Sequence, residues 1–387
     1  MKTTKKLLTL MGFATLLFAS CSQNEKIQKN VSGLDEALFD TTINEKPVKL
    51  FQLKNSKGMK VAITNFGGRV VSICVPDREG NMKDVVLGFD NVKQYADSVN
   101  SPSDFGAAIG RYANRINKGI INIDGKEISL PTNNFGHTLH GGPAGWQYQV
   151  YDAELVNDST LKLIMNSKDG DMNFPGNVNA IVTYTITDDN ALDIKYEATT
   201  DQTTVINMTN HSYFNLSGDA NNTILNDSLY INSTTFTPVD STYMTTGEIV
   251  PTEGTLFDFS AMKRIGEEIT EENLKNDEQM RNGNGYDHNW VLDTKGDDTK
   301  VAAVLKCPTT GIMLTMYTNE PGVQVYTGNF LNGAVTGKNG VVYKERTGIC
   351  LETQKYPDTP NKPEWPSAIL KPGETYNSHC IYKFSTF

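Results

Sequence analysis

One histidine, His211, stands among side chains of the kinds that bind a sugar and move a proton. Residues 207–216 read N-M-T-N-H-S-Y-F-N-L, so asparagines, hydroxyl-bearing residues and the rings of Tyr213 and Phe214 surround the imidazole. Amides and hydroxyls hydrogen-bond the OH groups of a sugar, aromatic rings cover its C–H faces, and an imidazole transfers protons. An isolated histidine is more often a core residue that hydrogen-bonds between strands, so it is the whole segment that favours a sugar site.

Further segments with chemistry-bearing residues are spread along the chain. They read G-R-Y-A-N-R-I at 110–116, L-H-G-G at 139–142, N-G-Y-D-H-N-W at 284–290, G-V-Q-V-Y-T-G-N at 322–329 and L-E-T-Q-K-Y-P-D at 351–358. Taken singly, each has an ordinary structural explanation. An isolated arginine usually pairs with a surface carboxylate, a glycine pair usually marks a turn, and a glutamate on a strand can face the solvent.

Together, these segments resemble the aldose 1-epimerase family, the galactose mutarotases. The resemblance runs from about residue 47 to the C-terminus and closes on K-P-G-E-T-Y at residues 371–376. It implies that His211 protonates the ring oxygen of the sugar and that Glu352 is the general base. It also implies sugar-binding roles for Asn114, Arg115, His140, Tyr213, Asp287 and Gln324.

The expected reaction needs an acid and a base. The base removes the proton from the C1 hydroxyl of an aldohexose such as galactose or glucose, the acid protonates the ring oxygen, and the open aldehyde then recloses. No redox step occurs, so we expect no cofactor, and the chain lacks a G-x-G-x-x-G fingerprint in a βαβ setting. Two alternatives stay open: a sugar-capturing lipoprotein without catalysis, and an enzyme of the same fold that acts on sugar phosphates.

The sequence predicts no metal site. His137 and His140 form an H-x-x-H pair without a nearby third ligand. Residues 169–173, D-G-D-M-N, resemble the start of a calcium loop, but the glycine is misplaced and Ala180 stands where an EF-hand has its bidentate glutamate. A calcium ion held elsewhere by scattered carboxylates stays open.

The sequence predicts β-structure for nearly all of the chain that positions these residues. Outside the first 20 residues, helical periodicity appears only in short stretches, such as residues 92–99 and 267–281. Without a visible repeat or a mid-chain linker, residues 41–387 form one expected catalytic domain, an all-β antiparallel sandwich with a few short helices. The resemblance narrows this to the galactose mutarotase-like β-supersandwich. The clearest strand patterns, β-branched or alternating with period two, lie at residues 61–64, 70–75, 190–199, 228–233 and 312–317.

The first 20 residues predict a lipoprotein signal peptide. They begin with lysines, continue with an apolar run at residues 7–19 that is too short to span a bilayer, and end next to Cys21. L-F-A-S-C at residues 17–21 resembles a bacterial lipobox, except that Phe18 stands where an aliphatic residue is usual. The alternative is an ordinary secretory signal that is cut nearby.

We expect Cys21 to be lipidated and residues 21–40 to be a polar tether, which places the protein in the periplasm or at the cell surface. The net charge of −10 argues against nucleic acid as a partner and against electrostatic attachment to a membrane. We therefore expect an aldohexose as the ligand, membrane contact only through the lipid anchor, and a monomer. The other cysteines lack framework spacing, so we expect buried free thiols at Cys74, Cys307, Cys350 and Cys380.

Overall fold

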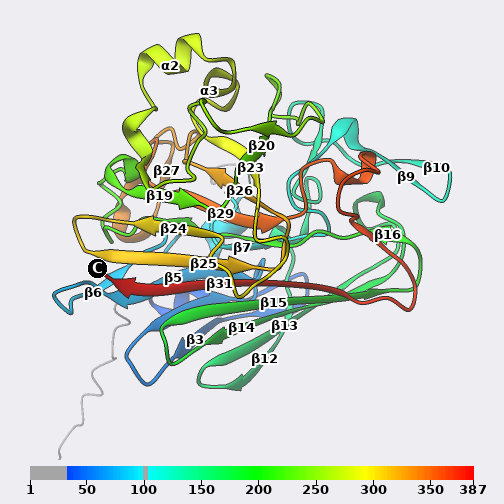
Figure 1. Ribbon diagram of the computed structural model, residues 1–387. Helices are drawn as coiled ribbons and strands as arrows, with labels where there is room; N and C mark the ends of the chain where they lie inside the picture. The colour runs from blue at the N-terminus through cyan, green and yellow to red at the C-terminus, as the bar shows by residue number, and fades with distance from the viewer. Residues whose placement is uncertain (1–32, 99–102) are drawn as a thin grey trace, which may run out of the picture.

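The computed structural model describes residues 33–98 and 103–387, which form antiparallel sheets with short helices between them (Figure 1). Cys21, the expected signal peptide and most of the expected tether lie outside the described residues, so lipidation and the domain boundaries stay predictions. Within the described ranges, no helix combines the length and the apolar character needed to cross a membrane.

The largest sheet has nine strands and crosses the lower half of Figure 1. Along β14 and β15, buried and partly exposed side chains alternate, because one face of the sheet packs on the core and the other lies nearer the solvent. The order across the sheet is β12 (Asp152–Asn157), β13 (Thr160–Ser167), β14 (Val178–Ile186), β15 (Ala191–Thr200), β31 (Tyr376–Thr386), β25 (Ile312–Thr318), β24 (Ala303–Lys306), β19 (Ser228–Ile231) and β22 (Lys263–Arg264).

A six-stranded sheet carries much of the candidate site. Every residue of β26 and β29 is buried, so these strands are covered on both faces. The order is β18 (Tyr213–Phe214), β29 (Ile349–Gln354), β26 (Gly322–Tyr326), β23 (Asp287–Val291), β20 (Thr235–Thr237) and β21 (Val250–Pro251). A four-stranded sheet contains β3 (Leu50–Lys54), β4 (Lys60–Thr64), β5 (Arg69–Pro76) and β6 (Met82–Asp84).

Two-stranded pairs complete the β-structure. The two that matter for the site are β7 (Ala107–Ile109) with β17 (Thr209–His211), and β8 (Arg115–Ile116) with β11 (Thr138–Leu139). The others are β1 (Thr41–Ile43) with β2 (Lys46–Val48), β9 (Ile120–Ile123) with β10 (Lys126–Ser129), β16 (Thr204–Val205) with β30 (Ile369–Leu370), and β27 (Val335–Thr336) with β28 (Val342–Tyr343).

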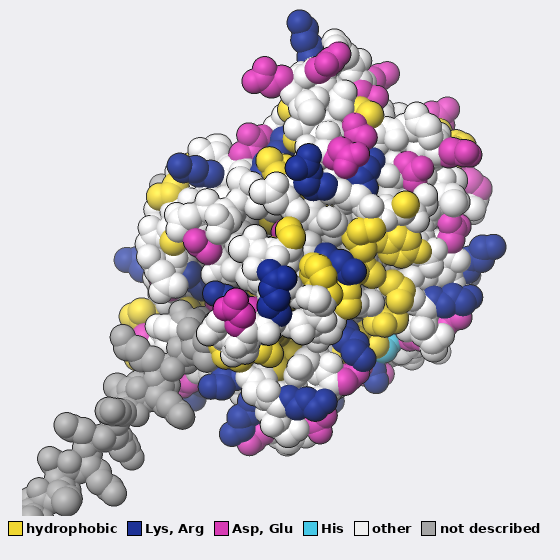
Figure 2. Space-filling model, turned by 60° about the vertical axis from the view of Figure 1, so that its left-hand side comes forward, with side chains coloured by type: hydrophobic (Ala, Val, Ile, Leu, Met, Phe, Trp, Pro, Cys, Tyr) yellow, Lys and Arg dark blue, Asp and Glu magenta, His cyan; other side chains and the backbone are white. Residues whose placement is uncertain are grey.

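The main hydrophobic core joins strands from both ends of the chain, from Leu53 on β3 to Phe384 on β31. Trp146 and Trp290 are its largest side chains, and each is no more than 1% exposed. Burying a large apolar side chain stabilises a fold by roughly 1.5–3 kcal/mol, so this shared core holds the sheets in fixed relative positions. On the face shown in Figure 2, basic and acidic side chains are interspersed.

The expected strands are confirmed as β4, β5, β15, β19 and β25. The first expected helix is α1 (Val92–Ala96), and the second is two helices, α2 (Glu271–Asn276) and α3 (Glu278–Gly283). Asp277 separates them because its side chain accepts a hydrogen bond from the Met280 amide and caps α3. The cysteines of the described residues are buried free thiols, as expected.

Candidate active site

Strand pairing brings three of the sequence segments side by side. Glu352 on β29 lies directly opposite Gln324 on β26, and β26 pairs on its other edge with β23, which begins at Asp287. The Gln324 side-chain amide donates to Oδ1 of Asp287 over 2.7 Å. Tyr213 on β18 lies opposite Cys350, so the strand after His211 borders the strand that carries Glu352.

A second pairing joins the arginine and the Leu-His-Gly-Gly segments. Arg115 on β8 lies opposite Leu139 on β11, so His140 follows immediately beside it. The backbone amide of Asn114 donates to Nδ1 of His140 over 3.2 Å. The backbone amide of His140 donates to the backbone carbonyl of Asn114, also over 3.2 Å. Both residues have left-handed backbone, with φ of 64° and 51°. Such strained positions cluster at functional sites.

These segments enclose one cavity of about 370 Å³, a volume at the lower end of the range for small-molecule sites. The structure brings together every catalytic and sugar-binding residue that the sequence predicted. The cavity is lined by His211, Glu352, Asn114, Arg115, His140, Tyr213, Asp287 and Gln324.

The expected acid and base face each other in this cavity. Nε2 of His211 lies 3.5 Å from Oε1 of Glu352, and the two residues are 5% and 2% exposed. On the other side of the imidazole, Nδ1 contacts Sγ of Cys350 at 3.5 Å. Tyr213 stacks on the imidazole with the ring centroids 5.1 Å apart, so this ring supports His211 as well as lining the cavity. Oε2 of Glu352 is buried without a partner, which leaves it free for a substrate hydroxyl.

Burial shifts the pKa of the acid and of the base in opposite directions. Desolvation raises the pKa of Glu352 well above its usual value, and the charges of Asp287 and Asp104 raise it further. Desolvation lowers the pKa of His211, and the charge of Asp104 partly opposes this. Burial therefore favours the neutral form of both groups, which disposes Glu352 to take up a proton and His211 to give one up.

His140 is a neutral hydrogen-bond donor. Desolvation lowers its pKa well below the usual value, and the charges of His211 and Arg115 lower it further. Because Nδ1 accepts the Asn114 amide, Nε2 carries the hydrogen of the neutral ring. That hydrogen suits a sugar oxygen, and it opposes metal binding through Nε2.

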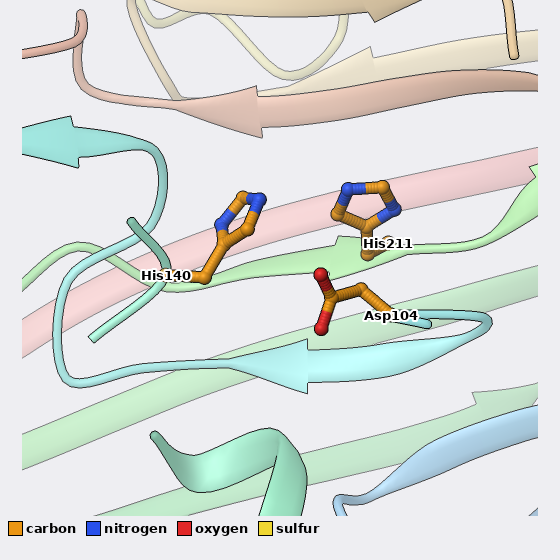
Figure 3. Close-up of side chains that lie close together, drawn as sticks. All are labelled: Asp104, His140 and His211. Atoms are coloured by element: carbon orange, nitrogen blue, oxygen red, sulfur yellow. The ribbon is translucent and has the colours of Figure 1, made fainter. Parts of the chain in front are cut away.

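Asp104 is a cavity residue that sequence reasoning missed. It lies in the loop before β7, and its carboxylate lies near the rings of His140 and His211 (Figure 3). One ligand atom from each of these three residues lies within 4.8 Å of the others. A metal would need a lone pair on His140, which the tautomer described above withholds from Nε2. No motif or spacing around Asp104 marked it, because β7 and β17 pair across a long stretch of sequence.

Another missed residue, Tyr326, had a weak signal in the sequence pattern. Tyr326 is two positions after Gln324 on β26, and alternate side chains of a strand share a face. Of the remaining residues, Leu139 is on β11, Tyr148 ends a 3-10 helix, and the others lie in loops whose position depends on the fold. Beyond the predicted set, the cavity is lined by Ser103, Asp104, Asn133, Asn134, Leu139, Tyr148, Tyr326 and Phe330.

The carboxylates of the calcium-like segment bind protein groups. Oδ1 of Asp169 accepts the Gly176 amide over 2.6 Å, and Oδ2 of Asp171 accepts the Ser167 hydroxyl over 2.6 Å. The acidic residues of residues 169–173 thus stabilise their own loop through hydrogen bonds to protein groups.

Comparison with known proteins agrees with this geometry. A family model described as aldose 1-epimerase matches residues 49–383. The chain belongs to the aldose 1-epimerase family. Human galactose mutarotase is 40% identical over 339 residues, which cover 87% of this chain and 94% of that protein. The aldose 1-epimerase of Escherichia coli K12 is 37% identical over 340 residues, which cover 87% of this chain and 95% of that protein.

The fold of this aldose 1-epimerase family member is also similar to solved structures. An aldose epimerase homologue from C. elegans has a TM-score of 0.80 and 29% identity, covering 88% of this chain and 99% of its own. The galactose 1-epimerase of Lactobacillus acidophilus has a TM-score of 0.76 and 26% identity, covering 89% of this chain and 97% of its own. The predicted galactose mutarotase-like fold is confirmed.

Proposed function

We propose that this protein is an aldose 1-epimerase that interconverts the α and β anomers of D-aldohexoses, with galactose and glucose as substrates. The observation that carries the proposal is the buried pair of His211 and Glu352, whose Nε2 and Oε1 lie 3.5 Å apart in a cavity with the volume of a small-molecule site. An imidazole and a carboxylate at this distance can both reach the C1 hydroxyl and the ring oxygen of one sugar.

The reaction begins when Glu352 removes the proton of the C1 hydroxyl. As C1 becomes a carbonyl carbon, its bond to the ring oxygen breaks, and the ring oxygen takes a proton from His211. Rotation about the C1–C2 bond turns the other face of the aldehyde toward the C5 hydroxyl. The ring recloses when His211 takes the proton back and Glu352 returns its proton to the C1 oxygen. Each such proton transfer contributes roughly 10²–10⁴ in rate.

The other polar residues of the cavity would orient the sugar. Arg115 and the Nε2–H group of His140 offer hydrogen-bond donors, and Asp287 offers an acceptor that the Gln324 amide holds in place. Correct orientation lowers the barrier because the reacting atoms start close to their transition-state positions. No step of this scheme transfers an electron, so we propose that the reaction needs no cofactor.

The charges of the cavity favour a neutral sugar over a sugar phosphate. Three acidic residues, Asp104, Asp287 and Glu352, line the cavity. Among the described residues that line it, Arg115 is the only lysine or arginine. Three carboxylates near one guanidinium would repel a phosphate dianion. A sugar-capturing protein without catalysis would need neither the acid nor the base.

The location and assembly state belong to the same proposal. We propose a lipoprotein anchored through Cys21 in the periplasm or at the cell surface, acting as a monomer. The support is the sequence of the first 21 residues, with its lysines, apolar run and cysteine. Anomers equilibrate outside the cytoplasm as well as inside it, so the chemistry is compatible with either compartment.

The function is tested by Glu352→Gln, with Glu154→Gln on the exposed edge strand β12 as the control. Glutamine keeps the shape of the side chain and removes the base, so kcat for mutarotation should fall by at least about 10²-fold while the sugar Kd stays within about tenfold. Initial rates are measured by polarimetry with freshly dissolved α-D-glucose and α-D-galactose, corrected for the spontaneous reaction. If the variant keeps more than about a tenth of the wild-type kcat, Glu352 is not the general base.

A further inference from the structure

The strand ladder that would hold the acid opposite the base is interrupted at the acid. After His211, Tyr213 on β18 pairs with Cys350 on β29. Extending this antiparallel register back along both strands puts His211 opposite Glu352, in agreement with the 3.5 Å between their side chains. However, β17, which ends at His211, takes β7 as its hydrogen-bonded partner. Other bonds must therefore keep this part of the chain in register with β29.

The side chain of Asn207 restores the register on the other side of the acid. Its Oδ1 accepts the backbone amide of Lys355 over 2.9 Å, and its Nδ2 donates to the backbone carbonyl of the same residue over 3.3 Å. Two such bonds to one residue are what a backbone pair exchanges in an antiparallel ladder. The extended register puts Met208 opposite Lys355, so the side chain of the preceding residue takes the place of a missing rung.

A second connection joins the next residue of the acid segment to the same lysine. The backbone amide of Met208 donates to the Tyr376 hydroxyl over 3.1 Å, and this hydroxyl donates to Oε1 of Glu320 over 3.2 Å. Oε2 of Glu320 in turn binds the ammonium group of Lys355. Glu320 is 0% exposed, and a buried carboxylate is stable only where it is paired and hydrogen-bonded. Lys355 is thus held to the acid segment through its backbone and its side chain.

Asn207 also contacts the segment that carries two sugar-binding residues. Its Nδ2 donates to the carbonyl of Ala113 over 3.1 Å, and the Ala113 amide donates to the carbonyl of Asn207 over 2.8 Å. Ala113 precedes Asn114 and Arg115, which line the cavity. One fully buried side chain therefore connects the acid segment, the base strand and the binding segment.

We propose that Asn207, Tyr376, Glu320 and Lys355 form a positioning clamp that sets the separation of the catalytic acid and base. None of the four is among the described residues that line the cavity, so the clamp acts through the backbone on either side of the reacting groups. This inference rests on the proposed function. Misplacing a reacting group by about 1 Å can lower a rate roughly 10²-fold, so the clamp is needed for the rate of mutarotation.

Asn207→Asp tests the clamp. A carboxyl group keeps the shape of the side chain but offers at most one hydrogen where the amide offers two, so the carbonyl of Lys355 or of Ala113 loses its donor. The kcat for mutarotation of glucose should fall at least about tenfold as the acid and the base lose their register. Initial rates are measured by polarimetry, with correction for the spontaneous reaction, at a temperature at which circular dichroism shows the variant to be folded.

Asn65→Asp is the matched control, because Asn65 is also buried and has the same bonding pattern away from the cavity. Its Oδ1 accepts the amide of Lys49 over 2.9 Å, and its Nδ2 donates to the carbonyls of Pro47 and Tyr151, each over 2.9 Å. Both substitutions should lower the urea midpoint of unfolding. Only Asn207→Asp should lower kcat, since a loss of stability alone leaves the folded molecules fully active.

Tyr376→Phe tests the second connection without touching the sugar-binding segment. The Met208 amide loses its acceptor and Glu320 loses a donor, so kcat should fall roughly three- to tenfold while KM stays within about twofold. Tyr95→Phe is the control, because the buried hydroxyl of Tyr95 likewise accepts a backbone amide, that of Phe89, over 2.9 Å.

Two results would overturn the clamp: a kcat of Asn207→Asp within twofold of the wild type, or equal losses of kcat in Asn207→Asp and Asn65→Asp. If Asn207→Asp does not fold, an unchanged kcat in Tyr376→Phe overturns it, and a lowered kcat with unchanged KM supports it. A wild-type protein that does not mutarotate glucose would instead overturn the proposed function.

Discussion

At the scale of single residues, Asp104 connects the acid and the base electrostatically. Its carboxylate lies close to the imidazoles of His140 and His211, and its Oδ1 is buried without a partner (Figure 3). A nearby negative charge favours the protonated form of both an imidazole and a carboxyl group, so Asp104 raises the pKa of both His211 and Glu352. For the acid, this opposes the effect of burial, and for the base it adds to it.

Replacing Asp104 by asparagine should move the pH optimum to lower pH. The wild-type profile of kcat/KM should be a bell, because the reaction starts from an ionised Glu352 and a protonated His211. Removing the Asp104 charge lowers both pKa values, so the acidic limb and the basic limb should shift in the same direction. The measurement is the pH profile of initial mutarotation rates for the wild type and Asp104→Asn.

Glu154→Gln, on the exposed edge strand, serves as a control for a general change of protein charge. Limbs that stay in place, or that move in opposite directions, would show that Asp104 does not act on both groups. Because the two groups are coupled, the profile reports the pair, and the shift of the whole bell is the quantity to compare.

At the scale of elements, Arg69 at the start of β5 fixes two parts of the cavity wall. Its guanidinium is buried and donates to the carbonyls of Phe105 over 3.0 Å, of Ser103 over 3.2 Å and of Gln147 over 3.0 Å. The segment of Ser103 and Phe105 carries Asp104, and Gln147 precedes Tyr148 of the cavity. These two loops have no regular strand pairing. The planar guanidinium of Arg69 holds them, because it presents several hydrogen-bond donors in fixed directions.

Arg69→Lys should therefore weaken both stability and catalysis. An ammonium group can satisfy at most part of this carbonyl set, and each buried acceptor left without a partner costs about 1–3 kcal/mol. We expect the free energy of unfolding to fall by about 2–4 kcal/mol and kcat to fall roughly tenfold as Asp104 loses its position. Urea unfolding and polarimetry measure the two effects.

Arg78→Lys provides a matched control, because Arg78 also donates to two carbonyls, those of Pro308 and Thr309, but does so at the surface. Equal effects of the two substitutions would contradict the special role of Arg69. A loss of stability with unchanged kcat would show that Arg69 supports the fold without positioning the site.

At the scale of the whole molecule, the N-terminal end of the described chain is attached to the domain. Leu34 and Phe39 are 5% and 0% exposed and belong to a hydrophobic cluster with Val48 and Tyr95. The 3-10 helix at Glu36–Phe39, capped by Asp35, carries this contact. If Cys21 is the lipid anchor, it precedes the buried Leu34 by only 13 residues of the chain, which would keep the catalytic domain close to the membrane surface.

Cys21→Ala tests the anchor. The variant should appear in the soluble fraction or keep an uncut signal peptide, because lipidation requires the thiol and stable anchoring requires more than one acyl chain. Fractionation of cells followed by mass determination of the N-terminus measures both outcomes. Ser22→Ala should stay in the membrane fraction. A Cys21 variant that stays there with a normally processed N-terminus would contradict lipidation.

The sequence by itself determined the types of residues at the site and five of the strands, β4, β5, β15, β19 and β25. Period-two alternation marked β15 and β25, because a strand with one face on the core must alternate. The motif resemblance picked out His211 and Glu352 although they are far apart in the chain. Such features could be predicted because each depends on neighbouring residues or on a pattern that a family shares.

Only the tertiary structure decided which residues meet and how strongly they influence one another. The approach of Asp104 to His211 depends on the pairing of β7 with β17, and the contact of Tyr243 with Arg115 depends on loops that are distant in sequence. The pKa shifts of His211 and Glu352 arise from desolvation, which exists only after the sheets have packed. Long-range pairing and burial are collective properties of the folded chain, so no local pattern of residues encodes them.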